Sequence, residues 1–205
     1  MKVRITYNAP VVLTFTLLAV LVYILPQSLH EWFEASPNLH GARAYVGLFS
    51  HILGHASWQH LIGNFMLILL IGPILEERHG SLQLLAMMLV TALVTGLIYA
   101  TFSGHGLMGA SGIVFMMILL ASTANIRQGE IPLTFIAIAV IYLGGELVQM
   151  FKSDDQVAHG AHMIGGLAGA AFGFIGARVK GTKKVKALEV AGLKPIEAPR
   201  RAKTT

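Results

Sequence analysis

Long runs of apolar residues, separated by short polar segments, are the main pattern along this chain. A membrane-spanning helix needs about 20 consecutive, mostly apolar residues, and windows of this kind follow one another through most of the sequence. They predict six spanning helices, at residues 9–27, 58–76, 82–102, 109–126, 131–151 and 160–179. The expected fold class is therefore all-α, a polytopic membrane protein built as a bundle of six transmembrane helices.

The segments around these spans divide the chain into three parts. Residues 1–8 are expected to form a short cytoplasmic N-terminus, and residues 9–179 the six-helix core. Residues 180–205 are expected to form a basic cytoplasmic tail that is disordered or lies on anionic lipid headgroups. Residues 28–57 form a long outer loop that is too apolar to be fully solvated, so we expect an amphipathic lid in the membrane interface. The first span is too long for a signal peptide and no cleavage site follows it, so we expect it to be retained.

Composition supports a bilayer as the solvent of this chain. Hydrophobic residues make up 55% of the sequence, charged residues only 12%, and the mean hydropathy is +0.67. A soluble domain of this length carries about twice that share of charge. There is no cysteine, which excludes a disulfide framework, a thiol nucleophile and a thiolate metal site.

The basic residues indicate a direction across the membrane. The net charge of +5 would suggest nucleic acid or anionic lipid if it covered a surface, but all the lysines and arginines except Arg43 and Lys152 lie on one side of the predicted topology. Cytoplasmic loops carry this excess of positive charge. We therefore expect both termini in the cytoplasm, membrane lipid as a partner and no nucleic acid partner. The expected location is a cell membrane, the bacterial inner membrane.

Polar residues gather at one depth of this topology. The second, fourth and sixth spans all run from the outside inward, so their first turns lie near the outer surface. The second carries His60 and Asn64, whose spacing places both on one helix face, the fourth begins with Ser111 between Gly109 and Gly112, and the sixth begins with His159 and His162.

These residue types fit acyl transfer by a serine nucleophile. Serine needs an adjacent base to take its proton, and histidine serves best because its unperturbed pKa lies near working pH. A serine–histidine dyad is the simpler proposal, since no aspartate lies in a span and a triad would need Glu146. The Glu146 side chain either faces a wet active-site cavity or reaches toward the membrane interface, and we favour the second. Taken singly, each residue also fits a structural role: Ser111 as a helix cap, Asn64 as an interhelical hydrogen-bonding residue, and His162 as a donor to a carbonyl.

Small residues in the sixth span favour close helix packing. Gly165, Gly169 and Gly173 recur every four residues, a spacing that lets two membrane helices approach closely. Packing of the sixth span on the fourth would bring His162 within hydrogen-bond reach of Ser111.

At this point the chain resembles the rhomboid family of intramembrane serine proteases. The similarity covers roughly residues 45–175, and its motifs read H-x-x-x-x-H-x-x-x-N at 55–64, E-x-R-x-G-S at 76–81, G-x-S-G at 109–112 and A-H-x-x-G-x-x-x-G at 161–169. The resemblance implies a nucleophile, Ser111, and a general base, His162. It also implies an oxyanion hole of His60, Asn64 and the Ser111 backbone N–H, with supporting roles for His55, Gly109, Phe115, Gly165 and Gly169.

The resemblance further implies that the substrates are transmembrane proteins, cleaved near the outer membrane face without a metal or organic cofactor. The chain departs from the family where relatives often carry Trp-Arg ahead of the first motif histidine. Residues 45–49 read YVGLF there, which changes how the outer loop is anchored but not the chemistry. Nothing in the sequence specifies an oligomeric state.

Two other functions compete with proteolysis. One is a membrane metalloenzyme or metal transporter that uses histidine nitrogens as ligands, from His51, His55, His60, His159 and His162. Against it, the sequence shows no acidic ligand beside them. The other is a catalytically silent relative that binds and escorts membrane helices, which the presence of both Ser111 and His162 makes less favoured.

Overall fold

The structure is a computed structural model that describes residues 6–37, 39–123, 131–151 and 156–190. The long helices are α1 (Pro10–Ile24), α4 (Trp58–His79), α5 (Ser81–Phe102), α6 (Ser111–Ser122), α7 (Leu133–Met150) and α8 (Gln156–Val190). Between α1 and α4 lie three short elements, α2 (Gln27–His30), η1 (Glu31–Phe33) and α3 (Gly41–Ser50). Among the described residues the only β pairing is an isolated bridge between Ala35 and Leu107.

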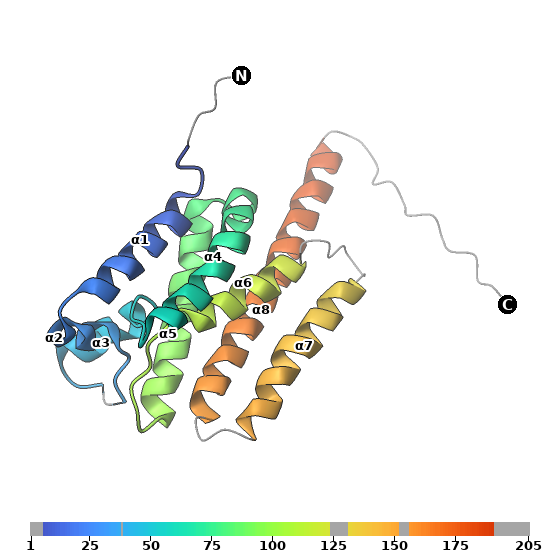
Figure 1. Ribbon diagram of the computed structural model, residues 1–205. Helices are drawn as coiled ribbons and strands as arrows, with labels where there is room; N and C mark the ends of the chain where they lie inside the picture. The colour runs from blue at the N-terminus through green and yellow to red at the C-terminus, as the bar shows by residue number, and fades with distance from the viewer. Residues whose placement is uncertain (1–5, 38, 124–130, 152–155, 191–205) are drawn as a thin grey trace.

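The six long helices match the six predicted spans. In Figure 1, α1, α4 and α5 form one side of the bundle, α7 and α8 lie side by side on the other, and α6 lies between the two groups. The first turn of α1 and the last turn of α8 lie at the same end of the bundle (Figure 1). Within the described ranges, α4 and α5 are long and apolar enough to cross a membrane by themselves, whereas α1, α6 and α7 are apolar but shorter.

The fourth predicted span forms a short central helix. Helix α6 has 12 residues, and most of its apolar side chains are buried, at Ile113, Val114, Met116, Met117, Ile118, Leu119 and Leu120. A helix that is apolar all round is stable only where other helices surround it or lipid covers it. Because α6 is enclosed by protein, its first residue is held in a fixed place.

The outer loop between α1 and α4 is ordered rather than extended. Helix α3 buries Ala44, Gly47 and Leu48 against the bundle and exposes Tyr45 and Phe49. Helix α3 is therefore amphipathic, the pattern that the lid prediction requires. Arg43 forms an ion pair with Glu31, and the Ser50 hydroxyl donates to the Trp32 carbonyl, so the loop is anchored within itself without the family's Trp-Arg.

A buried carboxylate joins α1 to α4. Glu76, near the end of α4, accepts the backbone N–H groups of Val11 and Val12 at 2.9 and 3.0 Å. These are orphan donors of the first turn of α1, where Pro10 occupies the first position, and a negative charge there also complements the helix dipole. The sequence predicts hydrogen bonds from Glu76 to the following turn, and the structure instead places its carboxylate on a different helix.

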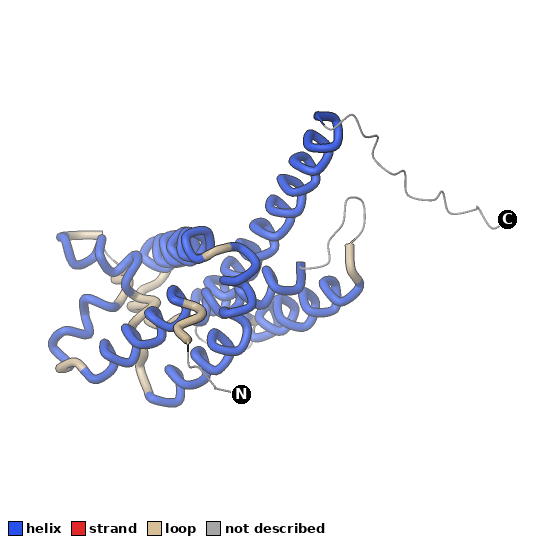
Figure 2. Tube along the Cα trace, turned by 90° about the horizontal axis from the view of Figure 1, so that it is seen from above, coloured by secondary structure: helices blue, strands red, loops and turns tan. Residues whose placement is uncertain are grey.

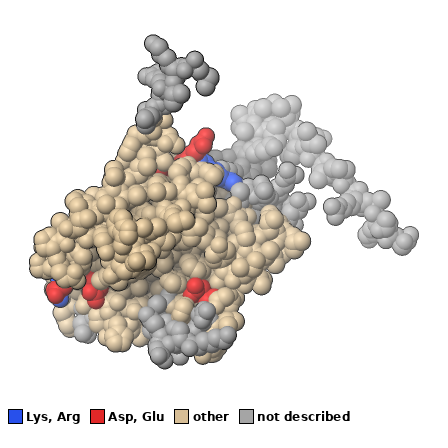
Figure 3. Space-filling model, in the orientation of Figure 1, with Lys and Arg blue, Asp and Glu red and all other residues tan. Residues whose placement is uncertain are grey.

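The last helix is longer than its predicted span. Helix α8 continues to Val190 and extends beyond the rest of the bundle in Figure 2. Residues 180–190, which the sequence assigned to a disordered tail, are therefore helical, and residues 191–205 lie outside the described ranges. On the face drawn in Figure 3, charged side chains are few and most of the surface belongs to other residues, as expected for a surface that meets lipid tails.

Candidate active site

The segment leading to Ser111 is fixed by the outer loop. Leu107 exchanges backbone hydrogen bonds with Ala35 at 2.9 and 3.0 Å, and the Gly109 N–H donates to the His51 carbonyl at 2.9 Å. Gly109 has a φ of +133°, a conformation that favours glycine. A Cβ there would also lie only 2.6 Å from Cε1 of His60. This turn places Ser111 as the first residue of α6.

The second functional side chain comes from α8. His162 Nε2 lies 2.7 Å from Ser111 Oγ, a normal hydrogen-bond distance for a nucleophile and its base. Glycines allow this approach, because a Cβ at Gly165 would overlap the Gly112 carbonyl and one at Gly169 the Met116 carbonyl. The prediction that small residues pack α8 against α6 is therefore confirmed.

The ring of His162 is held on its face and on its edge. Phe115, one turn after Ser111, stacks on the ring with centroids 5.0 Å apart and planes 10° apart, as the resemblance implied. Glu146, on α7, lies at the edge of the ring, with Oε2 3.2 Å from His162 Nδ1 and 2.5 Å from His159 Nδ1. The expectation that Glu146 reaches toward the membrane interface is therefore wrong.

A second histidine group supports the other side of the site. His55 donates from Nδ1 to the Leu53 carbonyl at 3.2 Å, and its Nε2 accepts from Asn64 Nδ2 at 3.1 Å and from the Ala110 N–H at 3.4 Å. Burial lowers the pKa of His55 from 6.5 to about 4. The ring is therefore neutral near pH 7, so it has a lone pair for Asn64 and for the turn that precedes Ser111.

His51 has the same kind of environment. Its Nδ1 bonds to the Gly47 carbonyl at 3.1 Å, its Nε2 lies 3.4 Å from the Thr95 hydroxyl, and burial lowers its pKa from 6.5 to about 4. Its carbonyl also receives the Gly109 N–H described above. His51 therefore holds in place the turn that precedes Ser111, which we call the serine turn. Sequence reasoning missed this role because the contact depends on loop geometry.

The structure brings most of the predicted site residues to one end of α6. Ser111 and His162 bond directly, His60 lies against Gly109, and Asn64 reaches the turn through His55. Glu146 is the site residue whose place was mispredicted. Glu146 and His159 lie at similar sequence distances from the turn between α7 and α8. Two residues equally far from the turn of a helical hairpin lie at the same depth, and this is the signal that would have placed Glu146 beside the histidines.

The cluster of Glu146, His159 and His162 also has donors of the types that zinc binds. One ligand atom from each lies within 4.8 Å of the others, so the sequence argument that no acidic group lies beside the histidines does not hold. In the structure both histidines bond to the Glu146 carboxylate, and His162 bonds to Ser111 as well. The arrangement as it stands therefore suits proton transfer.

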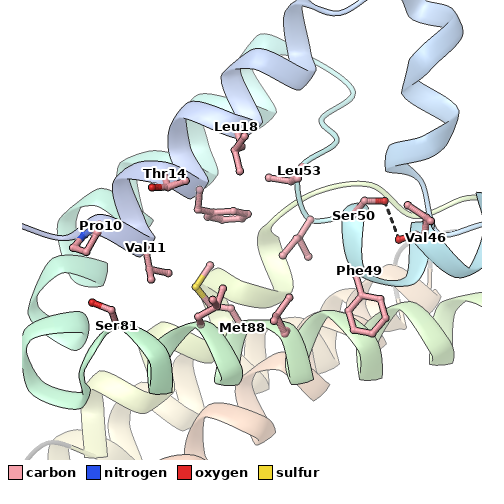
Figure 4. A pocket seen from close by; sticks show the side chains of 14 residues that line it. Pro10, Val11, Thr14, Leu18, Val46, Phe49, Ser50, Leu53, Ser81 and Met88 are labelled. Carbon is pink, nitrogen blue, oxygen red and sulfur yellow. Dashed lines mark hydrogen bonds between the residues drawn. The ribbon is translucent and has the colours of Figure 1, made fainter. Parts of the chain in front are cut away.

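A large apolar cavity elsewhere lacks such chemistry. It has a volume of about 660 Å³ and lies between α1, α3 and α5, where Figure 4 shows Val11, Leu18, Phe49 and Met88 around it. Its lining includes neither Ser111 nor any histidine. The reactive groups are therefore not in this cavity but at the first turns of α4, α6 and α8.

Sequence comparisons give the same assignment as the fold and the serine–histidine contact. The rhomboid domain matches residues 42–179. Rhomboid-related protein 1 of Caenorhabditis elegans is 33% identical over 141 residues, covering 62% of this chain but only 38% of that protein. Rhomboid protease GlpG of Haemophilus influenzae is 24% identical over 189 residues, covering 88% of this chain and 97% of that protein.

The protein is a polytopic helical bundle in which a serine and a histidine are in hydrogen-bond contact. These two features assign it to the class of intramembrane serine proteases. The chain belongs to the rhomboid family, and its fold is the six-helix polytopic fold of that family.

Proposed function

We propose that this chain is an intramembrane serine endopeptidase with Ser111 as the nucleophile and His162 as the general base. The single observation that carries the proposal is the 2.7 Å contact between His162 Nε2 and Ser111 Oγ. The contact joins residues on two different helices, and the two residues are 51 positions apart in sequence. The glycines that permit it leave no room for even one methyl group, so it is a specific feature of this packing.

The reaction would proceed by acyl transfer. His162 takes the Ser111 proton as Oγ attacks the carbonyl carbon of the substrate, and then returns this proton to the leaving nitrogen. Water hydrolyses the acyl-enzyme with the same base. Neither step requires a metal or an organic cofactor.

The oxyanion would be stabilised by groups around the first turn of α6. The Ser111 backbone N–H belongs to the orphan donors of that turn. Asn64 uses one amide hydrogen toward His55 and has a second one to offer, and the His60 ring lies beside Gly109. Fixed donors of this kind stabilise developing negative charge in a water-poor site.

The substrates would be transmembrane segments of other membrane proteins. A helix shields its peptide bonds with its own hydrogen bonds, so the segment must unwind near Ser111, which favours small or helix-breaking residues. The distribution of basic residues supports cytoplasmic termini, and with that orientation the cleavage would occur near the outer face of a cell membrane.

Labelling with a fluorophosphonate probe tests the proposal. The purified full chain in detergent should be labelled, whereas Ser111→Ala and His162→Ala should not. Ser122→Ala is the matched control, since Ser122 lies at the other end of α6 and its hydroxyl donates to the Leu119 carbonyl. An unlabelled wild type beside a reactive rhomboid protease would refute the proposal and favour a helix-binding role.

A further inference from the structure

We propose that Glu146 is a positioning residue for His162, so that this chain works with a Ser111–His162–Glu146 triad. The inference rests on the proposed function and deepens it. Glu146 Oε2 lies 3.2 Å from Nδ1 of His162, while Nε2 of the same ring lies 2.7 Å from Ser111 Oγ. The three groups thus form one hydrogen-bonded line through both nitrogens of the imidazole.

The carboxylate selects one tautomer of the histidine. An ionised carboxylate only accepts hydrogen bonds, so Nδ1 of His162 must carry the hydrogen. Nε2 then has its lone pair directed at Ser111 and is able to take the hydroxyl proton. The other tautomer has a hydrogen on Nε2 and is unable to act as a base.

The carboxylate also stabilises the charge that forms in the reaction. When Oγ bonds to the substrate carbonyl carbon, its proton moves to Nε2 and the ring becomes an imidazolium. Glu146 remains ionised next to Nδ1–H, and the proton leaves again with the departing nitrogen as the C–N bond breaks. The Glu146 side chain is 16% exposed, so water screens this charge pair only in part.

His159 holds the carboxylate in place. Its Nδ1 bonds to the same oxygen at 2.5 Å, from the turn of α8 that precedes His162. Phe115 restrains the face of the His162 ring while Glu146 restrains its edge. Helices α6, α7 and α8 each contribute one restraint, so the orientation of the base is over-determined, as a preorganised site requires.

The kinetics of fluorophosphonate labelling test this role when kinact and KI are measured separately. Glu146→Gln should lower kinact by about a hundredfold with KI nearly unchanged, since loss of the orienting acid affects the chemical step. Glu146→Asp should recover most of the rate, because it restores the charge. Glu77→Gln, an exposed glutamate on α4, is the matched control and should label like the wild type.

Two results would overturn the proposal. One is a wild-type kinact for Glu146→Gln. The other is a change in KI alone, which would mean that the carboxylate only joins α7 to α8. A thermal unfolding scan of each variant identifies any rate loss that comes from misfolding.

Nitrogen NMR of the histidine side chains gives a readout that needs no activity. In the wild type, His162, assigned with the His162→Ala variant, should carry its hydrogen on Nδ1, and Glu146→Ala should convert it to a mixture of tautomers. A mixture already present in the wild type refutes the role of Glu146 even if the serine is labelled. An unlabelled wild type with the Nδ1 tautomer refutes the proposed function alone.

Discussion

Two pairs of histidines, His51 with His55 and His159 with His162, lie around the active site, and their hydrogen-bond partners differ. His51 and His55 are 1% and 3% exposed and bond through Nδ1 to backbone carbonyls. The side chains of His159 and His162 are 20% and 22% exposed and bond to the carboxylate of Glu146. The first pair is buried beside neutral acceptors, whereas the second pair is partly exposed to solvent and lies beside a negative charge.

The difference shows how one residue type serves both scaffold and chemistry. A buried imidazole without a counter-charge remains neutral, because burial disfavours the charged form, and it then connects two fixed groups through its nitrogens. An imidazole beside a carboxylate is able to carry a positive charge during a reaction. The partner of each ring, rather than the spacing of the histidines in the sequence, decides its role.

The largest difference between the two pairs is expected when one histidine from each pair is replaced by glutamine. His162→Gln is expected to lower the rate of fluorophosphonate labelling by about a thousandfold or more, with a free energy of unfolding close to that of the wild type. His51→Gln should do the reverse, losing about 1–3 kcal/mol of unfolding free energy in detergent but keeping most of its labelling. If both variants lose activity and stability together, the division of roles is wrong.

The buried pair, His51 and His55, which we call the scaffold pair, should also make the stability of the protein depend on pH. His51 has a pKa of about 4 when folded against 6.5 in the unfolded chain, so between these values the unfolded state binds more protons. Stability is therefore complete above pH 6.5 and is lost as the pH falls, by about 3 kcal/mol at pH 4 from His51 alone. Denaturation of wild type and His51→Gln across this range measures the difference. Parallel curves would contradict the assignment.

The second pair depends on helix packing for its geometry. Gly165→Ala places a methyl group against the Gly112 carbonyl and should move His162 away from Ser111. A displacement of about 1 Å is enough to lower the labelling rate about a hundredfold. Gly176→Ala, on the same helix with nothing within 4 Å of the added group, should behave like the wild type. Equal labelling of both variants would show that the contact tolerates separation of α6 and α8.

The smallest effect on labelling is expected from substitution of His55, the member of the scaffold pair that bonds to Asn64 and to the Ala110 N–H. His55→Leu removes the acceptor of Asn64 and of the Ala110 N–H, and should lower labelling about tenfold while costing about 1–3 kcal/mol of stability. His105→Leu alters an exposed histidine in the loop before α6 and serves as the control. Unchanged labelling in His55→Leu would mean that Asn64 keeps its place without this bond.

The parts of the site that sequence reasoning predicted are those set by depth and helix face. Ser111, His162, His60 and Asn64 begin spans that run in the same direction, so topology alone brings them to one level. The glycines of α8 were read correctly because close packing of membrane helices has few other solutions.

The parts that were missed depend on rotation and on loop structure. Helix α7 carries apolar residues on all sides, so its periodicity does not indicate which way Glu146 points. The role of His51 arises from its carbonyl, which has no side-chain signature. Glu76 was correctly assigned to a helix end, but the sequence does not show that the end belongs to α1 rather than to its own helix.

The position of Glu76 also has a consequence for how the protein is made. The carboxylate that completes the start of α1 follows it by 65 residues, so α1 enters the membrane before its acceptor has been synthesised. Until α4 arrives, the amides of Val11 and Val12 must find water or lipid headgroups at the membrane surface. The contact between α1 and Glu76 therefore forms only after α4 has been synthesised.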